Sequence, residues 1–278
     1  MRIAVVAPGA MGAAVARRLH ERGAEVAITL AGRSEASARR ADGLPVRESE
    51  AALGAWADLV LSILPPGEAL GFARRMAPVL AGRGAVFADC NAVSPETVGQ
   101  VAASLPGVAV VDIGIIGGPP KSEGAGPRLY ASGEAAPRLE ALRAHGIDLR
   151  MIEGGIGAAS ALKMSYAGIT KGLVALGSAM ALGATKSGAA AALRAELAAS
   201  QPDILRILDR GVPDMFAKAY RWVAEMEEIA AFLGDIPAGP IYSGAAGLYA
   251  ALAADASSPE ADGPIARLAA FYGGNATK

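Results

Sequence analysis

The sequence is poor in the side chains that build disulfides and metal centres. Its 278 residues include one cysteine, Cys90, and two histidines, His20 and His145. A single cysteine excludes a disulfide framework and a multi-cysteine metal centre, and it fits a reducing compartment. Two histidines provide too few ligands for a typical histidine-based metal centre. We therefore expect a cytoplasmic protein without a metal site.

Neither sign of charge predominates in the chain. Lys and Arg number 26 against 27 Asp and Glu, which gives a formal net charge of −1. This balance lacks the basic surface that nucleic acids or anionic membranes attract. We expect no nucleic-acid or membrane partner, and a small-molecule substrate instead.

Long hydrophobic runs without charge are also missing, although 53% of the residues are hydrophobic. The most apolar stretch, residues 154–185, is interrupted by Lys163 and Lys171. No charge-free run that is also continuously apolar reaches the roughly 18–20 residues that a bilayer span needs. The apolar N-terminus resembles a signal peptide, but Pro8 and the glycines that follow it interrupt the apolar segment.

Residues 1–153 alternate short apolar runs with helical patterns. Continuous rather than alternating hydrophobicity in these runs favours a parallel sheet covered on both faces. We predict an α/β domain of the Rossmann type, a doubly wound parallel sheet. Its expected strands are residues 2–7, 25–30, 58–64, 84–89 and 108–112, and its expected helices include 10–22 and 94–104.

Strand patterns vanish after the glycine-rich segment 154–157. We predict an all-helical C-terminal domain, residues 154–278, joined to the first domain by one long interdomain helix. This domain would serve substrate binding and dimerisation. The expected helices are residues 158–186, 189–199, 202–209, 213–233, 245–254 and 263–272.

The first strand runs directly into a glycine-rich turn and a helix. The turn reads Ala7-Pro8-Gly9-Ala10-Met11-Gly12, a G-x-G-x-x-G pattern whose first glycine is alanine. Gly9 would let the backbone approach a pyrophosphate, and Gly12 would let the helix pack close to the strand. This position predicts dinucleotide binding; the alternative is a plain tight turn. The predicted cofactor-binding residues here are Pro8, Gly9, Ala10, Met11 and Gly12.

The end of the second strand indicates which dinucleotide binds. An NAD site would place Asp or Glu there to bind the ribose 2′-hydroxyl. The segment reads Leu30-Ala31-Gly32-Arg33-Ser34 and has no acid. The Arg33 guanidinium and the Ser34 hydroxyl suit a 2′-phosphate. NADP is therefore predicted and NAD is the second choice; the alternative is a solvated arginine before an N-cap serine.

The glycine-rich turn and four further motifs together resemble the β-hydroxyacid dehydrogenase family, which includes 3-hydroxyisobutyrate and 6-phosphogluconate dehydrogenases. The four motifs are Ser62-Ile63-Leu64-Pro65-Pro66, then Asp89-Cys90-Asn91-Ala92-Val93-Ser94-Pro95, then Asp112-Ile113-Gly114-Ile115-Ile116-Gly117-Gly118-Pro119, and Gly157 followed by Lys163. The likeness covers the N-terminal domain and the start of the interdomain helix. The rest looks like a less characterised branch with a short helical domain.

The resemblance implies an oxidoreductase that transfers hydride between a nicotinamide and a hydroxyl or carbonyl carbon of a small carboxylate-type substrate. Leu64, Pro65, Pro66 and Asn91 would border the nicotinamide and its ribose. Backbone N–H groups of Gly117 and Gly118 would bind the substrate carboxylate. Lys163 matches the family's catalytic lysine, which exchanges a proton with the substrate oxygen; the alternative is a snorkelling surface lysine.

Three departures from the family pattern affect the substrate side. Ile116 stands where the family has serine, Asn91 replaces a serine, and Ala167 fills the position of an asparagine. Tyr166 and Thr170 share a helix face with Lys163 at three- to seven-residue spacing. With Asn91, Ile116, Gly117 and Gly118 they complete the predicted substrate contacts. Tyr166 is either a substitute polar group or a core aromatic residue.

Two other functions are compatible with the same motifs. Imine reductases share the architecture but usually lack the catalytic lysine, so Lys163 favours alcohol and ketone chemistry. A non-catalytic NADP-binding sensor or assembly protein would keep the fold without turnover. We also expect a homodimer, because the long helix carries Gly168, Gly172, Gly177 and Gly183, which allow close helix contact.

Overall fold

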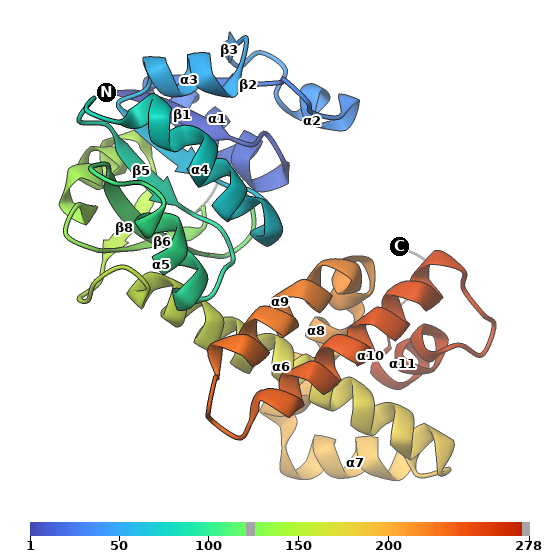
Figure 1. Ribbon diagram of the computed structural model, residues 1–278. Coiled ribbons are helices and arrows are strands. Elements are labelled where there is room, and N and C mark those ends of the chain that lie inside the picture. Colours follow the sequence, from blue (N-terminus) through green and yellow to red (C-terminus); the bar gives the residue numbers. More distant parts are fainter. Residues whose placement is uncertain (121–125, 274–278) are drawn as a thin grey trace. The chain divides into compact units, whose positions relative to one another are not determined.

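The structure, a computed structural model, describes residues 1–120 and 126–273. The chain forms two compact units, Met1–Met164 and Ser165–Lys278 (Figure 1). The division falls inside the long helix α6 (Ala158–Lys186), whereas the sequence boundary at residues 153/154 precedes this helix. The first turns of α6 bind to the sheet of the first unit through contacts given below, which places them in that unit.

The N-terminal unit is built on one sheet, which has eight strands among the described residues, in the order β3-β2-β1-β4-β5-β6-β7-β8. All neighbouring strands are parallel except β6 and β7, which are antiparallel. The strands are β1 (Arg2–Val6), β2 (Glu25–Thr29), β3 (Val46–Arg47), β4 (Leu59–Ser62), β5 (Val86–Asp89), β6 (Ala109–Ile116), β7 (Arg128–Ser132) and β8 (Asp148–Met151).

The predicted doubly wound α/β fold is confirmed, and the predicted purely parallel sheet is corrected to a mixed, largely parallel one. β3, β7 and β8 were not predicted, and β6 extends beyond its predicted end to Ile116. β7 has the sequence RLYAS, which mixes polar and apolar residues and lacks the continuous apolar run of a central strand. An antiparallel neighbour also needs no crossover helix, so β7 leaves no βαβ pattern in the sequence.

Helices cover both faces of the sheet. The helices of this unit are α1 (Ala10–Glu21), α2 (Glu35–Arg40), α3 (Glu50–Trp56), α4 (Ala69–Leu80) and α5 (Pro95–Ala103), with the 3₁₀ helices η1 (Pro66–Glu68) and η2 (Ala136–His145). Residues of α1 and η2 join one buried cluster with Ile3 and Val5 of β1. Residues of α3, α4 and α5 join another with Ala4 and Val6. Successive β1 residues are therefore buried on opposite faces, which explains the continuous apolar run.

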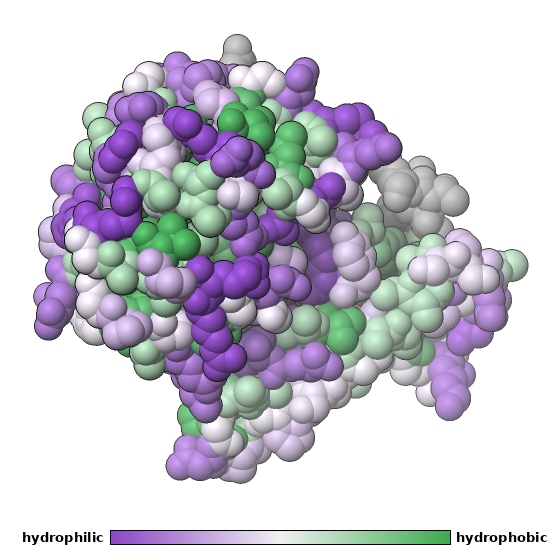
Figure 2. Space-filling model, turned by 45° about the horizontal axis from the view of Figure 1, so that its top comes forward, coloured by the Kyte–Doolittle hydropathy of each residue, from purple (hydrophilic) through white to green (hydrophobic). Residues whose placement is uncertain are grey.

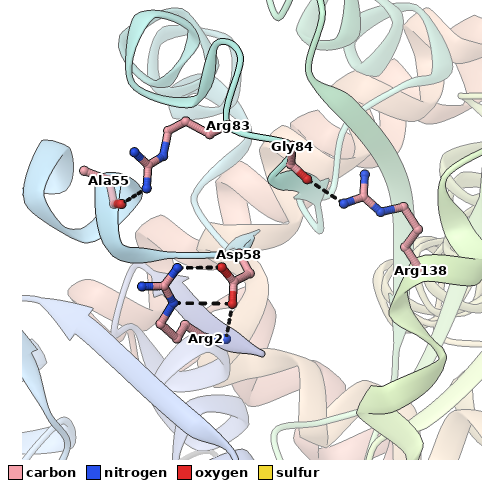
Figure 3. A network of polar contacts seen from close by, with 6 residues as sticks. All are labelled: Arg2, Ala55, Asp58, Arg83, Gly84 and Arg138. Atoms are coloured by element: carbon pink, nitrogen blue, oxygen red, sulfur yellow. Dashed lines mark hydrogen bonds and ion pairs between the residues drawn. The ribbon is translucent and has the colours of Figure 1, made fainter.

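The visible outer surface of this unit is mainly hydrophilic, with small hydrophobic areas between the polar side chains (Figure 2). At the amino edge of the sheet, Arg2 donates to the Asp58 carboxylate from its backbone and its guanidinium (Figure 3). The Arg2 hydrogen bonds lower the pKa of Asp58 to about 2. Arg83 donates to the carbonyl of Ala55 at the same edge. These contacts stabilise the edge of the sheet at the amino ends of the strands. The loops with the predicted site residues lie at the opposite, carboxyl edge.

The second unit is all helical in its described part, as predicted. It comprises most of α6, then α7 (Ala190–Ser200), α8 (Pro202–Met215), η3 (Phe216–Lys218), α9 (Ala219–Phe232), α10 (Gly239–Ser257) and α11 (Pro264–Tyr272). The Tyr249 hydroxyl donates to the carbonyl of Lys171 at 2.6 Å, and the Tyr272 hydroxyl donates to the carbonyl of Gly177 at 2.9 Å. These bonds hold α10 and α11 to α6. By length and composition alone, α6 could cross a membrane.

Three of the four α6 glycines given above as a reason for a homodimer instead make contacts within the chain, whereas a Cβ at Gly183 would meet no heavy atom within 4 Å. A Cβ at Gly168 would lie 3.1 Å from the Tyr242 hydroxyl, and a Cβ at Gly177 would lie 2.6 Å from Cδ2 of Leu208. Gly172 also faces Tyr242. The close helix contacts therefore join α6 to α10 and α8 of the same chain.

Candidate active site

The loops that carry the predicted site residues meet at the carboxyl edge of the sheet. β1, β4, β5 and β6 are parallel neighbours, with Val6 opposite Ser62, Ser62 opposite Asp89, and Asp89 opposite Asp112. Their carboxyl ends therefore share one edge. Ligands of open α/β sheets bind outside this edge. The segments that follow these strands contain Pro8 to Gly12, Leu64 to Pro66, Asn91 and, after β6, Gly117 with Gly118.

The glycine-rich turn leaves space for a bound group. Gly9 is the N-cap residue of α1, and a Cβ placed on it would meet no heavy atom within 4 Å. A Cβ at Gly12 would lie only 2.0 Å from the carbonyl oxygen of Ala7, so glycine alone fits there. The first turn of α1 holds no acidic residue. Its N–H groups lack helical partners and attract anions. These features fit a dinucleotide pyrophosphate.

Arg33 and Ser34 have different surroundings at the end of β2. The Ser34 hydroxyl accepts the Ser37 N–H at 3.3 Å and caps α2, which is the alternative considered for this serine. Arg33 is not a solvated loop residue, because its Nη2 pairs with Glu50 Oε1 at 3.1 Å. Its Nε is buried and has no hydrogen-bond partner in the described chain. A buried donor without a partner is uncommon in folded proteins.

Asn91 joins the ends of β4 and β5. Its Oδ1 accepts the Leu64 N–H at 2.6 Å, and its Nδ2 donates to Ser62 Oγ at 3.0 Å and Asp89 Oδ2 at 2.9 Å. The side chain is 2% exposed. Both amide N–H groups therefore bind partners inside the protein. In the structure, Asn91 fixes the turn that contains Pro65 and Pro66. Sequence reasoning had given Asn91 a ligand contact and missed this role.

A buried carboxylate fixes the beginning of α6 on the sheet. Asp112 of β6 accepts the backbone N–H groups of Gly157 at 3.0 Å and Ser160 at 2.9 Å, and the Ser160 hydroxyl at 2.7 Å. Ser132 of β7 accepts the Ala159 N–H at 3.0 Å. An anionic acceptor stabilises a helix N-terminus by satisfying its free N–H groups and its dipole. Sequence reasoning quoted Asp112 within a motif but missed this function.

Lys163 lies in the part of α6 that this anchor holds. A Cβ at Gly114 of β6 would lie 3.3 Å from Cβ of Lys163 and 2.6 Å from the carbonyl oxygen of Ala159. Burial lowers the pKa of Lys163 to about 8, while nearby Cys90, Asp89 and Asp112 oppose this shift. An amine with this pKa exists in both protonation states near neutral pH, as general acid–base catalysis requires.

The acidic groups near Lys163 are also perturbed by burial. Burial raises the pKa of Asp89 to about 6, against the hydrogen bonds from Asn91 and the charge of Lys163. Burial raises the pKa of the Cys90 thiol well above its usual value, so the thiol is not a ready nucleophile. Because the Asp89 carboxylate is engaged by hydrogen bonds from Asn91, Lys163 is the candidate group for proton transfer here.

The predicted substrate contacts are less uniform. Ile116 is buried and pairs with Arg128 in the sheet. Gly117, with φ of +124°, and Gly118 follow it and are exposed. Tyr166 is 46% exposed, which excludes the core-aromatic alternative. The Thr170 hydroxyl donates to the carbonyl of Tyr166 at 2.9 Å. Tyr166 and Thr170 belong to the second compact unit, whereas Lys163 belongs to the first.

No group of three or more His, Cys, Asp or Glu residues that could hold a metal occurs in residues 1–120 and 126–273.

Comparison with known proteins gives matches for both halves of the chain. Residues 2–143 match the NAD binding domain of 6-phosphogluconate dehydrogenase, and residues 184–252 match a domain of unknown function, DUF1932. An uncharacterized 28.5 kDa protein from Methanothermus fervidus, in the 7S RNA 5′ region, is 28% identical over 178 residues. That match covers 63% of this chain and 68% of the relative.

Solved structures extend the similarity to nearly the whole chain. The conserved protein MTH1747, of unknown function and described as structurally similar to 3-hydroxyacid dehydrogenases, is 27% identical with a TM-score of 0.73. The match covers 91% of this chain and 96% of that one. The 3-hydroxyisobutyrate dehydrogenase of Mycobacterium tuberculosis, solved with L-serine, is 22% identical, with a TM-score of 0.68 and coverage of 92% and 95%. At that identity, the likeness shows a shared fold.

The sequence match to the NAD binding domain and the carboxyl-edge loops agree with each other. The chain therefore belongs to the family with the NAD binding domain of 6-phosphogluconate dehydrogenase, and it carries a C-terminal DUF1932 helical domain.

Proposed function

We propose that this protein is an NADP-dependent oxidoreductase that acts on a hydroxyl- or carbonyl-bearing carbon of a small carboxylate-type substrate. The observation that carries the proposal is Lys163, with a pKa lowered to about 8, held against Gly114 in the unit that contains the dinucleotide-binding turn. Lysines are seldom buried in folded proteins.

The N-terminal unit supplies the groups that would hold the cofactor. Residues 8–12 would bind the pyrophosphate through backbone N–H groups and the N-terminus of α1. Arg33 would bind the 2′-phosphate, and the turn from Leu64 to Pro66 would border the nicotinamide ribose. When bound, the nicotinamide supplies a hydride acceptor or donor. NAD would bind the same turn without the contact from Arg33 to a phosphate.

Lys163 would move the proton that accompanies this redox change. In the oxidation direction its neutral amine accepts the proton of the substrate hydroxyl, and in the reduction direction its ammonium returns a proton to the carbonyl oxygen. Gly117 and Gly118 would bind the substrate carboxylate through their N–H groups. Ile116 offers no hydroxyl to that carboxylate, which disfavours a short 3-hydroxy acid.

A substrate screen tests this proposal. NADP reduction is followed with 3-hydroxy acids, sugar acids and bulkier or aromatic alcohols, and NADPH oxidation is followed with the matching carbonyl compounds and with cyclic imines. We expect turnover of an alcohol–carbonyl pair that requires Lys163. Turnover of imines alone, unaffected by Lys163→Ala, would favour an imine reductase. Tight NADPH binding without any turnover would favour a sensor or assembly protein.

We also propose a cytoplasmic homodimer. Helix α6 exposes Ile169, Leu176 and Met180, whose exposed fractions are 72%, 60% and 57%. Exposed apolar side chains of this size gathered on one helix are typical of an association surface. We take a second copy of the chain as the partner, because most soluble oligomers are symmetric homo-oligomers.

A further inference from the structure

Glu50, the first residue of α3, lies between two guanidinium groups. Its Oε1 is 3.1 Å from Nη2 of Arg33, and its Oε2 is 2.9 Å from Nε of Arg75 on α4. Helices α3 and α4 pack against each other (Figure 1). The carboxylate thus connects Arg33, the residue assigned to the 2′-phosphate, with an arginine outside the nucleotide-binding loops.

The contact with Glu50 leaves Arg33 fewer N–H groups for binding a phosphate. Its Nη2 pairs with Glu50, and its Nε is buried and without a partner in the described chain. The side chains of Arg33 and Glu50 are each 21% exposed, so water screens the pair only in part. A guanidinium binds phosphate strongly when it offers two parallel N–H groups. Nη2 takes part in both two-donor edges of the guanidinium, so the Glu50 carboxylate competes with a phosphate for one of its N–H groups.

The charge of Glu50 also distinguishes the two dinucleotides. A 2′-phosphate and the Glu50 carboxylate repel each other at one guanidinium, because both are anionic. The 2′-hydroxyl of NAD is neutral and donates a hydrogen bond that a carboxylate can accept. The same side chain therefore opposes the phosphate and is compatible with the hydroxyl.

We infer that Glu50 is a specificity-determining residue of the cofactor site. Its carboxylate competes with the 2′-phosphate for Arg33, and this competition reduces the ratio of the affinity for NADP to the affinity for NAD. Arg75 retains the carboxylate when Arg33 turns to the phosphate, since it contacts Glu50 through both Nε and Nη2. The inference rests on the 2′-phosphate site proposed for Arg33.

Binding titrations without substrate test the inference. The ligands are NADPH, NADH and adenosine 2′,5′-bisphosphate, which carries the 2′-phosphate without the nicotinamide. For Glu50→Gln we expect the Kd of NADPH and of the bisphosphate to fall about tenfold, with NADH within about twofold of wild type. For Arg75→Gln we expect NADPH to bind about threefold more weakly or worse, because Glu50 then pairs with Arg33 alone.

Two double variants show whether the three side chains act together. Glu50→Gln with Arg75→Gln should bind NADPH like Glu50→Gln alone, because Arg75 acts only through the carboxylate. Glu50→Gln with Arg33→Gln should bind NADPH like Arg33→Gln alone. Thermal melts establish that each variant is folded, and Glu50→Asp, which shortens the reach to Arg33, should also tighten NADPH binding.

The outcomes separate this inference from the proposal beneath it. If Arg33→Gln weakens NADPH binding but Glu50→Gln fails to tighten it, Glu50 merely orients Arg33; the inference is then wrong and the NADP proposal stands. If Arg33→Gln leaves NADPH affinity unchanged, the 2′-phosphate site is wrong and the inference falls with it.

Discussion

Gly114 of β6 lies directly against Lys163 of α6. A Cβ at Gly114 would be 3.3 Å from the Lys163 Cβ and 2.6 Å from the carbonyl oxygen of Ala159. Strand and helix backbones therefore approach more closely than any other side chain at position 114 would permit. This contact determines how closely the Lys163 backbone approaches β6 near the carboxyl edge of the sheet.

The first prediction concerns Gly114→Ala. The added methyl group forces α6 away from β6, so we expect the free energy of unfolding to fall by about 1–3 kcal/mol. Because Lys163 moves with the helix, we expect turnover to fall by about tenfold to a hundredfold. Denaturant unfolding and steady-state kinetics measure the two effects.

Gly99→Ala is the matched control for that variant. A Cβ at Gly99, on α5, would meet no heavy atom within 4 Å. We expect this change to stabilise the protein by about 0.5–1 kcal/mol, because alanine is the better helix former. Wild-type stability and turnover in Gly114→Ala would show that the close approach is not needed.

The second prediction concerns the anchor of α6. Asp112→Ala removes the acceptor of the Gly157 and Ser160 N–H groups, and we expect a loss of about 1–3 kcal/mol in unfolding free energy. Asp112→Asn keeps a carbonyl acceptor and should lose less. Because the charge of Asp112 raises the pKa of Lys163, Asp112→Asn should move the pH profile of oxidation to lower pH. A shift to higher pH would contradict this coupling.

The third prediction is the pH dependence of catalysis. Since the pKa of Lys163 is about 8, oxidation, which needs the neutral amine, should rise with pH and level off above that value. Reduction, which needs the ammonium, should fall through the same range. Initial rates in both directions from pH 6 to pH 10 measure this, and a profile that Lys163→Arg leaves unchanged would assign the titration to another group.

Stability should follow the same residue with a defined sign. The folded-state pKa of Lys163, about 8, lies below its ordinary value of 10.5. The unfolded chain therefore binds more protons between these values, and the contribution of Lys163 to the unfolding free energy should rise as pH increases from 8 to 10.5. Lys163→Met should remove this rise, which denaturant titrations at several pH values can detect.

The fourth prediction is that the exposed side of α6 forms a dimer interface. We expect light scattering to give twice the chain mass of 27.8 kDa at micromolar concentration. Leu176→Glu combined with Met180→Glu should yield monomers, because charges in an apolar interface are costly to bury. The matched control is Tyr220→Glu, which places a charge on α9, outside the proposed interface, at a side chain that is 68% exposed. This variant should remain a dimer. A wild-type monomer would refute the dimer.

Local sequence patterns were sufficient to predict the central strands, α1 and α6. Both faces of β1 are buried, so its residues form a continuous apolar run, and Gly12 marks the contact between α1 and the strand. β7 and β8 were missed because both short segments mix polar and apolar residues, and pairing with neighbouring strands of the sheet stabilises them.

The candidate site was predictable where one loop or helix carries the chemistry, as for the glycine-rich turn and Lys163. Contacts between distant segments were not predictable. Asp112 caps a helix 45 residues later, and Arg33 pairs with Glu50 17 residues later. Neither partner stands at a fixed spacing in the sequence, because the turns and helices between them set the contact. The internal bonds of Asn91 were hidden for the same reason.

The most direct measurement compares turnover and NADPH affinity in Lys163→Ala and Lys163→Arg, assayed on the substrate that the screen identifies. If Lys163 transfers the proton, turnover by Lys163→Ala should fall by about 10²–10⁴, while the Kd of NADPH stays within about threefold of wild type. Lys163→Arg should also be impaired, because a guanidinium does not release its proton near neutral pH. Turnover by Lys163→Ala within threefold of wild type would contradict the assignment.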